Sequence, residues 1–138
     1  MDPAHKLLGR QFADKIIARD FSAARALLAP WLQDSMTSAA LQGVIEERLT
    51  EMMEYAECKT LTYPVGCDID GNSCTLEDLQ DDEPFPPEVT PANFRKWMCL
   101  QFLADESVAI DAWFDLWMAL VEVDGKLAVG FFKFEDPD

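Results

Sequence analysis

Apolar and polar positions alternate along the last third of the chain, which predicts two long β-strands. The strands cover residues 108–123 and 126–134 and meet at Asp124-Gly125. Asp-Gly between two strand-like runs is the strongest short signal for a hairpin, because a type I′ turn needs a positive φ at both central positions. We therefore predict that the fold is organised around a C-terminal hairpin.

A two-residue turn fixes which residues of this hairpin face each other, and the alternation of side chains then gives it two faces. The expected pairs are Val123 with Lys126, Val121 with Ala128, Ala119 with Gly130, and Trp117 with Phe132. The face with these pairs mixes aromatic rings and carboxylates, which predicts a cavity wall or a contact surface; it also carries Asp111, Trp113, Asp115 and Phe134. The other face is apolar and is expected to pack on helices; it carries Ile110, Phe114, Leu116, Met118, Leu120, Leu127, Val129 and Phe131.

Apolar residues recur at helical spacing in the first part of the chain, which predicts three helices. We place them at about residues 3–19, 21–28 and 38–55. Asp2-Pro3 and Asp20 have the composition of helix starts. Pro30 is expected to end the second helix, because the residue before a proline is pushed out of helical geometry. Trp31 and Leu32 are then expected in a turn.

Three shorter segments follow the helices. Apolar and polar residues alternate over 59–65, which predicts a short edge strand. The composition of residues 68–72 predicts a turn closed by Asp and Asn side chains. A calcium loop is not expected there, because Ser73 and Leu79 stand where that motif needs glycine and glutamate. Residues 94–103 fit both a helix and a strand, and their length and aromatic content favour a strand. As a strand, this segment would present Phe94, Met98, Leu100 and Phe102 on one face.

An acidic, proline-rich loop is expected at about residues 66–92. Its centre, Glu77 to Glu88, is dense in carboxylates and then in prolines, which predicts an exposed, extended segment. A lid, or an attractive surface for a cationic partner, is one interpretation. A solvated connector is the interpretation that we favour.

The composition predicts one acidic domain spanning residues 1–138. The chain has 26 acidic and 11 basic residues and a net charge of −15. Such a charge repels nucleic acids and anionic membranes, so neither is expected as a partner. A basic protein or a small apolar ligand remains compatible with it.

No signal peptide pattern opens the sequence, so we expect a cytoplasmic protein with reduced cysteines. The four cysteines form no C-x-x-C pair, and the one histidine is His5. A zinc site is therefore not expected, and no metal or other cofactor is predicted.

Two stretches resemble the nuclear transport factor 2-like superfamily, which includes the polyketide cyclase-like domains. Residues 12–30 look like the family's opening, with an acidic residue before an aromatic and a Leu-Leu pair before a proline. Residues 121–130 look like its last hairpin. The resemblance implies a cystatin-like α+β cone, in which three N-terminal helices pack on a strongly curved antiparallel sheet and leave a conical pocket. Members include isomerases, cyclases and dehydratases as well as binding, dimerisation and immunity modules, so the fold does not fix the function.

An enzyme of the isomerase or cyclase type would need a buried carboxylate base in the pocket. The candidates are Asp111 or Asp115, with Tyr55 as a donor. No catalytic motif of the family matches residue by residue, so none is carried over. The two aspartates are four strand positions apart, about 13 Å, which is too far for a carboxylate dyad.

The favoured interpretation is a non-catalytic binding or interaction module that dimerises through its sheet. The expected ligand or interface residues are Trp113, Trp117, Ala119, Gly130, Phe132 and Phe134. The alternatives are the isomerase or cyclase-type enzyme and an immunity-type inhibitor, whose acidic loop would cover a basic protein.

Overall fold

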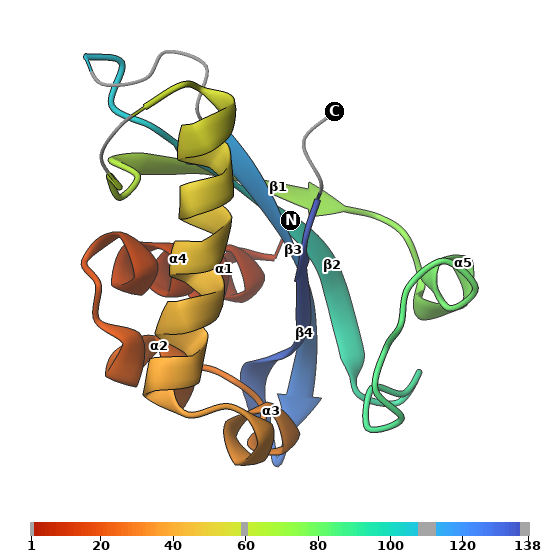
Figure 1. The fold of residues 1–138 in the computed structure, drawn as a ribbon. Coiled ribbons are helices and arrows are strands. Elements are labelled where there is room, and N and C mark those ends of the chain that lie inside the picture. Colours follow the sequence, from red (N-terminus) through yellow and green to blue (C-terminus); the bar gives the residue numbers. More distant parts are fainter. Residues whose placement is uncertain (1, 59–60, 108–112, 136–138) are drawn as a thin grey trace.

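The computed structural model describes residues 2–58, 61–107 and 113–135, and in these ranges helices precede a four-stranded antiparallel sheet (Figure 1). The predicted α+β class is confirmed. The sheet order is β1-β2-β3-β4, so every strand pairs with its neighbours in the sequence. The helices are α1 (Pro3–Ile17), α2 (Phe21–Ala26), α3 (Pro30–Ser35), α4 (Ser38–Tyr55) and α5 (Leu76–Leu79). The strands are β1 (Gly66–Asn72), β2 (Phe94–Leu103), β3 (Trp113–Val123) and β4 (Lys126–Phe134).

The helices α1 to α4 cover one face of the sheet, and α5 lies on the other side (Figure 1). The face toward α1–α4 is called the inner face below, and the opposite one the outer face. The inner side is filled by large side chains with no more than 2% exposure, including Phe12, Ile16, Ile45, Leu49, Met98, Leu100, Phe102, Leu116 and Met118. Burial of this apolar surface is the main force that holds helices and sheet together.

The helix starts follow the sequence prediction, with one exception. The carboxylates of Asp2 and Asp20 accept hydrogen bonds from Ala4 N and Ala23 N, as expected for N-caps. Pro30, however, begins a helix (α3) in place of the predicted turn. Proline suits the first helical position, because its φ is already helical and its missing N–H would have no partner there. The number of helices before the sheet is therefore four and not the predicted three.

The hairpin forms at Asp124-Gly125, with φ of 54° and 77° at the two turn residues. The predicted pairs next to the turn are confirmed, Val123 with Lys126 and Val121 with Ala128. Beyond them the predicted register is wrong. Leu120 pairs with Val129 but Ala119 pairs with Phe131, so Gly130 is an extra residue in β4. This β-bulge moves each later residue of β4 to the face opposite the predicted one.

The bulge lies where β4 contacts the segment between α2 and α3 and the first turn of α3. The indole Nε1 of Trp31 donates to Gly130 O at 2.8 Å. Val129 N donates to Leu27 O at 2.9 Å, and Ala29 N donates to Val129 O at 2.8 Å. The edge of β4 that faces away from β3 is thus paired with residues 27–29 at Val129. The consequence is that Phe131 joins the outer face, while Phe132 and Phe134 pack on the inner core.

A second irregularity lies in β2, whose predicted bounds of 94–103 are confirmed. Phe94 pairs with Val121 and Lys96 with Leu120, so Arg95 is the extra residue. Phe94 therefore packs with the outer-face residues and not with Met98 on the inner face, as predicted.

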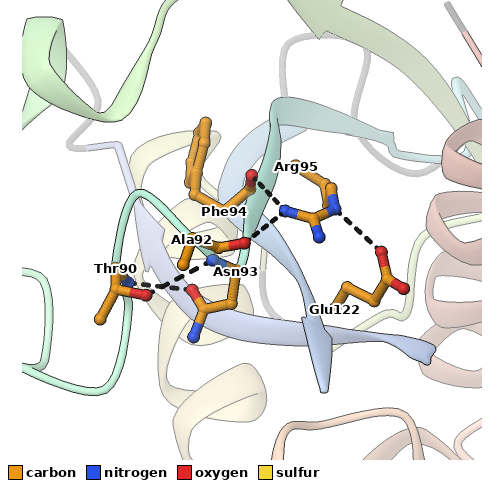
Figure 2. A network of polar contacts seen from close by, with 6 residues as sticks. All are labelled: Thr90, Ala92, Asn93, Phe94, Arg95 and Glu122. Carbon is orange, nitrogen blue, oxygen red and sulfur yellow. Dashed lines mark hydrogen bonds and ion pairs between the residues drawn. The ribbon is translucent and has the colours of Figure 1, made fainter. Parts of the chain in front are cut away.

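The start of β2 is fixed by a polar network (Figure 2). Arg95 Nε lies 2.9 Å from Glu122 Oε2, and Arg95 Nη1 donates to the carbonyl oxygens of Ala92 and Phe94. Thr90 N donates to Asn93 Oδ1 and Asn93 N donates to Thr90 Oγ1, which closes the turn before the strand. The network links the end of the proline-rich segment to β3.

The first strand lies seven residues later than predicted. Residues 61–65 are not a strand, residues 59–60 lie outside the described ranges, and β1 occupies 66–72, where a turn and the beginning of the acidic loop were expected. In β1 the side chains of Cys67 and Ile69 contribute to the inner core, whereas Asp68 and Asp70 are exposed. This alternation is the ordinary pattern of an edge strand with one buried face.

Candidate functional site

The outer face of the sheet brings aromatic rings and carboxylates together in three rows that cross the strands. The strand pairings place them as follows. The aromatic row consists of Asn72, Trp97, Ala119 and Phe131, the mixed row of Asp70, Cys99, Trp117 and Lys133, and the acidic row of Asp68, Gln101, Asp115 and Glu135. Glu135 belongs to the acidic row because its N–H donates to Asp115 O at 3.1 Å.

The aromatic rings on this face form one stack. Trp97 lies between Trp117 and Phe131, with ring centroids 5.6 and 6.4 Å away and nearly parallel planes. Phe85 packs edge-on against Trp97 and Phe131 at 5.7 and 5.0 Å. Trp97 is only 4% exposed as a result. Edge-on and offset-stacked arrangements are those that aromatic pairs favour.

Phe85 comes from the acidic, proline-rich segment, so this segment is not the solvated connector that the sequence analysis favoured. We call residues 80–91 the strap. Its Phe85 and Val89 pack on the outer-face residues, and Glu83 Oε1 lies 2.7 Å from Lys133 Nζ. The preceding residues 76–79 form α5, capped by Thr75, where an irregular loop was predicted. The strap therefore covers the aromatic row.

The acidic row holds two neighbouring carboxyl groups. Burial raises the pKa of Asp115, and the charge of Glu135 and a proton shared with Glu135 raise this pKa further, while Arg48 opposes the shift. Asp115 Oδ1 is buried and has no hydrogen-bond partner among the described residues. Glu135 Oε2 accepts a hydrogen bond from Trp117 Nε1 at 3.1 Å. The pair is thus suited to receive a proton or a positively charged group.

The raised pKa of Asp115, caused first by burial and then by the charge of Glu135, has a measurable effect on stability. Because the pKa of Asp115 is above its usual 3.8 in the folded chain, stability is lost as pH rises from 3.8 through the raised value. We expect Asp115→Asn to raise the thermal midpoint at pH 7 by about 1–3 °C and to leave it unchanged near pH 3. Thermal unfolding followed by circular dichroism at both pH values measures this, with Asp68→Asn as a control in the same row. An equal gain at both pH values would contradict the assigned cause.

The thiols of Cys67 and Cys99, in β1 and β2, are expected to be weak nucleophiles. Burial raises the pKa of Cys67 and of Cys99 to about 12, and the charges of Asp115, Glu135 and Asp70 add to the shift at Cys99. Because only the thiolate is nucleophilic, both thiols should react with iodoacetamide at pH 8 at least tenfold more slowly in the folded chain than in urea. Mass spectrometry of alkylated peptides tests this, and rapid labelling of Cys99 in the folded chain would refute it.

Of the predicted site residues, the structure brings Asp115 and Trp117 together on the outer face. Ala119 lies on this face but is fully buried, and Gly130 is the bulge residue. Phe132 and Phe134 pack on the inner core, so their predicted place on the contact face is wrong. Tyr55 is 58% exposed at the end of α4 and so belongs to the helical layer. Asp111 and the side chain of Trp113 lie outside the described residues.

Sequence reasoning missed four residues of this face. The missed residues are Phe85, Trp97, Phe131 and Glu135. The alternation in residues 94–103 puts Trp97 on the face away from Met98, but only the folded structure shows that its ring stacks on Trp117. No local pattern marks Phe85, because its contacts lie in β2 and β4.

The cavities of the described chain lie elsewhere. A cleft of about 530 Å³ opens between the end of β1, the start of α5 and the start of β2, and Arg95 and Lys96 line it. Another, of about 370 Å³, lies beside the strap. A third, of about 10 Å³ and roughly enough for one water molecule, lies between α4 and the sheet, with Met52 and Phe102 in its lining. Asp115 lines none of these three.

The comparisons with known proteins give no match: no family model, no curated protein and no solved structure is significantly similar to this chain. No helix among the described residues is long and apolar enough to cross a membrane. Within the same ranges, no three His, Cys, Asp or Glu side chains are grouped as a metal site would require.

Proposed function

We propose that the chain is a non-catalytic binding module that holds a basic segment of a partner protein on the acidic row of its outer face. One observation carries the proposal: two like-charged residues, Asp115 and Glu135, are neighbours, with Glu135 N donating to Asp115 O at 3.1 Å and Asp115 Oδ1 buried without a hydrogen-bond partner among the described residues. Asp68 lies in the same row and Asp70 in the next one, and both are exposed. A lysine or arginine side chain placed here would relieve the repulsion that the free chain carries.

The charge of the whole chain supports the same class of partner. With a net charge of −15, the chain attracts a basic protein over about 8–10 Å at physiological salt and repels acidic ones. Arginine and lysine pair with carboxylates through charge-assisted hydrogen bonds, which are the stronger kind. The immunity-type inhibitor of a basic protein is one form of such a module.

Catalysis with Asp115 as the base is the second candidate, because its raised pKa is the property that a general base needs. A base also needs a bound substrate beside it. The carboxylates beside Asp115, those of Asp68 and Asp70, are exposed and suit a basic segment, so we place binding ahead of catalysis.

We further propose that the chain is a distant member of the nuclear transport factor 2-like superfamily and a cytoplasmic protein. The order of helices before an antiparallel sheet, with two long last strands, supports the first point. Pairing of two copies through the sheet stays a prediction, which light scattering at tens of micromolar tests. The strap covers the aromatic row and the acidic row is uncovered, so such a dimer would place like charges opposite each other.

Tetralysine is a suitable probe for the acidic row, because it carries charge and no apolar side chain. The test variant is Asp68→Asn/Asp70→Asn/Glu135→Gln. The matched control, Asp14→Asn/Asp34→Asn/Glu47→Gln, removes three exposed carboxylates from the helical layer and leaves the same net charge.

The triple variant of the outer face should bind tetralysine about tenfold more weakly than the wild type, because each exposed ion pair contributes about 0.2–1 kcal/mol. The control should lose less than twofold. Isothermal titration calorimetry at 50 mM salt measures both affinities. Equal losses in the two variants would show that only net charge matters, and the proposed site would be rejected.

A further inference from the structure

The strap is attached to the rest of the molecule by few polar contacts. Among the described residues, its hydrogen bonds join positions no more than five apart in the sequence, apart from the bond between Glu83 and Lys133. Its other attachment is apolar, through Phe85 and Val89. A segment without backbone hydrogen bonds to its neighbours can open at a much lower free energy than the sheet below it.

The surface under the strap is already arranged for an aromatic ring. Trp97 and Phe131 lie with nearly parallel planes, and the Phe85 ring meets both edge-on, at interplanar angles of 80° and 67°. Trp117 extends the stack toward the acidic row, where its indole donates to Glu135. An external ring in the place of Phe85 would make the same contacts.

We propose that Phe85 is an internal substitute for an aromatic side chain of the basic partner, which displaces the strap when it binds. This proposal rests on the proposed function, because the acidic row supplies the charge that attracts the partner. The aromatic and acidic rows are four positions apart along β2, from Trp97 to Gln101. An extended partner segment along the strands would therefore carry its aromatic residue and its lysine or arginine four positions apart, at about 13 Å.

The ion pair between Glu83 and Lys133 sets how firmly the strap is closed. The Glu83 side chain is 11% exposed and that of Lys133 is 36% exposed, so the pair is partly shielded from water. Its removal weakens the closed state and leaves the aromatic site untouched. A ligand that binds only the open state gains affinity in proportion to the fraction of open molecules.

The test uses a five-residue peptide, Phe-Ser-Thr-Ser-Arg with blocked ends, and two versions in which Phe becomes Ala or Arg becomes Gln. Its affinity is measured by calorimetry for the wild type, Phe85→Ala and Lys133→Met. We expect about tenfold tighter binding to Phe85→Ala and a gain of about threefold for Lys133→Met. The gain for Phe85→Ala should vanish with the peptide that lacks Phe. The gain for Lys133→Met should be larger with Phe than with Ala, because the loss of the Lys133 charge also strengthens binding of the arginine in both peptides. Gln80→Ala, an exposed change within the strap that alters neither charge nor a proline, should leave the affinity unchanged.

The outcomes separate this proposal from the previous one. If neither variant gains affinity while circular dichroism shows both to be folded, the strap is a fixed part of the core and the proposal fails. If Phe85→Ala does not fold, Lys133→Met decides alone, because it leaves the ring contacts intact. If the gain is present but the peptide with Gln binds equally well, the aromatic site is supported and the acidic site is rejected.

Discussion

Replacing Gly130 with alanine is expected to lower the free energy of unfolding by about 2–3 kcal/mol. A Cβ at this position would lie 2.6 and 2.9 Å from the two Cγ atoms of Val121 and 3.2 Å from Trp31 Cζ2. Val121 is fully buried and β-branched, so it cannot turn away from the added methyl group without strain. Trp31 is held by its hydrogen bond to Gly130 O.

Gly43→Ala is the matched control for this prediction. A Cβ at Gly43 meets no atom within 4 Å, and the residue lies within α4. Alanine there should stabilise the chain by about 0.4–1 kcal/mol, because it removes freedom from the unfolded state. Urea unfolding followed by tryptophan fluorescence measures both variants. If the two substitutions shift the midpoint in the same direction, Gly130 does not have the close contacts described here.

The same position marks how far local sequence patterns predict this fold. The helix α4, the strand β2 and the Asp-Gly turn follow from spacing and turn chemistry, which depend on near neighbours. The bulge residue Gly130 contacts Trp31, which lies 99 positions away in the chain and so beyond any local pattern. One extra residue was enough to exchange the faces of Phe131 and Phe132.

The candidate site, like the fold, was predictable only where it depends on local patterns. The face of Asp115 and Trp117 was predicted correctly from the alternation, because the extra residue lies in β4 and leaves the alternation of β3 unchanged. The segment that covers this face was not predicted, because Glu83 and Phe85 are held by contacts with Lys133 of β4 and Trp97 of β2 and not by residues near them in the sequence. A stretch rich in prolines and carboxylates is typical of an exposed loop, and one phenylalanine within it changes its role.

On β2 from Met98 onward, by contrast, the inner face followed the alternation, and Phe102 is the best test of it. Phe102 is fully buried and stacks on Phe114, with centroids 4.8 Å apart and planes at 20°. Phe102→Ala is expected to lower the free energy of unfolding by about 3–5 kcal/mol, because a large cavity would open between α4 and the sheet. Leu103→Ala, at the next position and 37% exposed, should cost less than about 1 kcal/mol.

Guanidinium unfolding of the two variants at pH 7 measures this difference. The two positions are neighbours in one strand, and differences in β-propensity amount to no more than about 1 kcal/mol, so a larger contrast reports the two faces of the sheet. Equal losses would mean that Phe102 and Leu103 are buried alike, and that β2 does not separate an inner from an outer layer. Because Trp97 and the strap depend on that separation, the binding face proposed here would be lost with it.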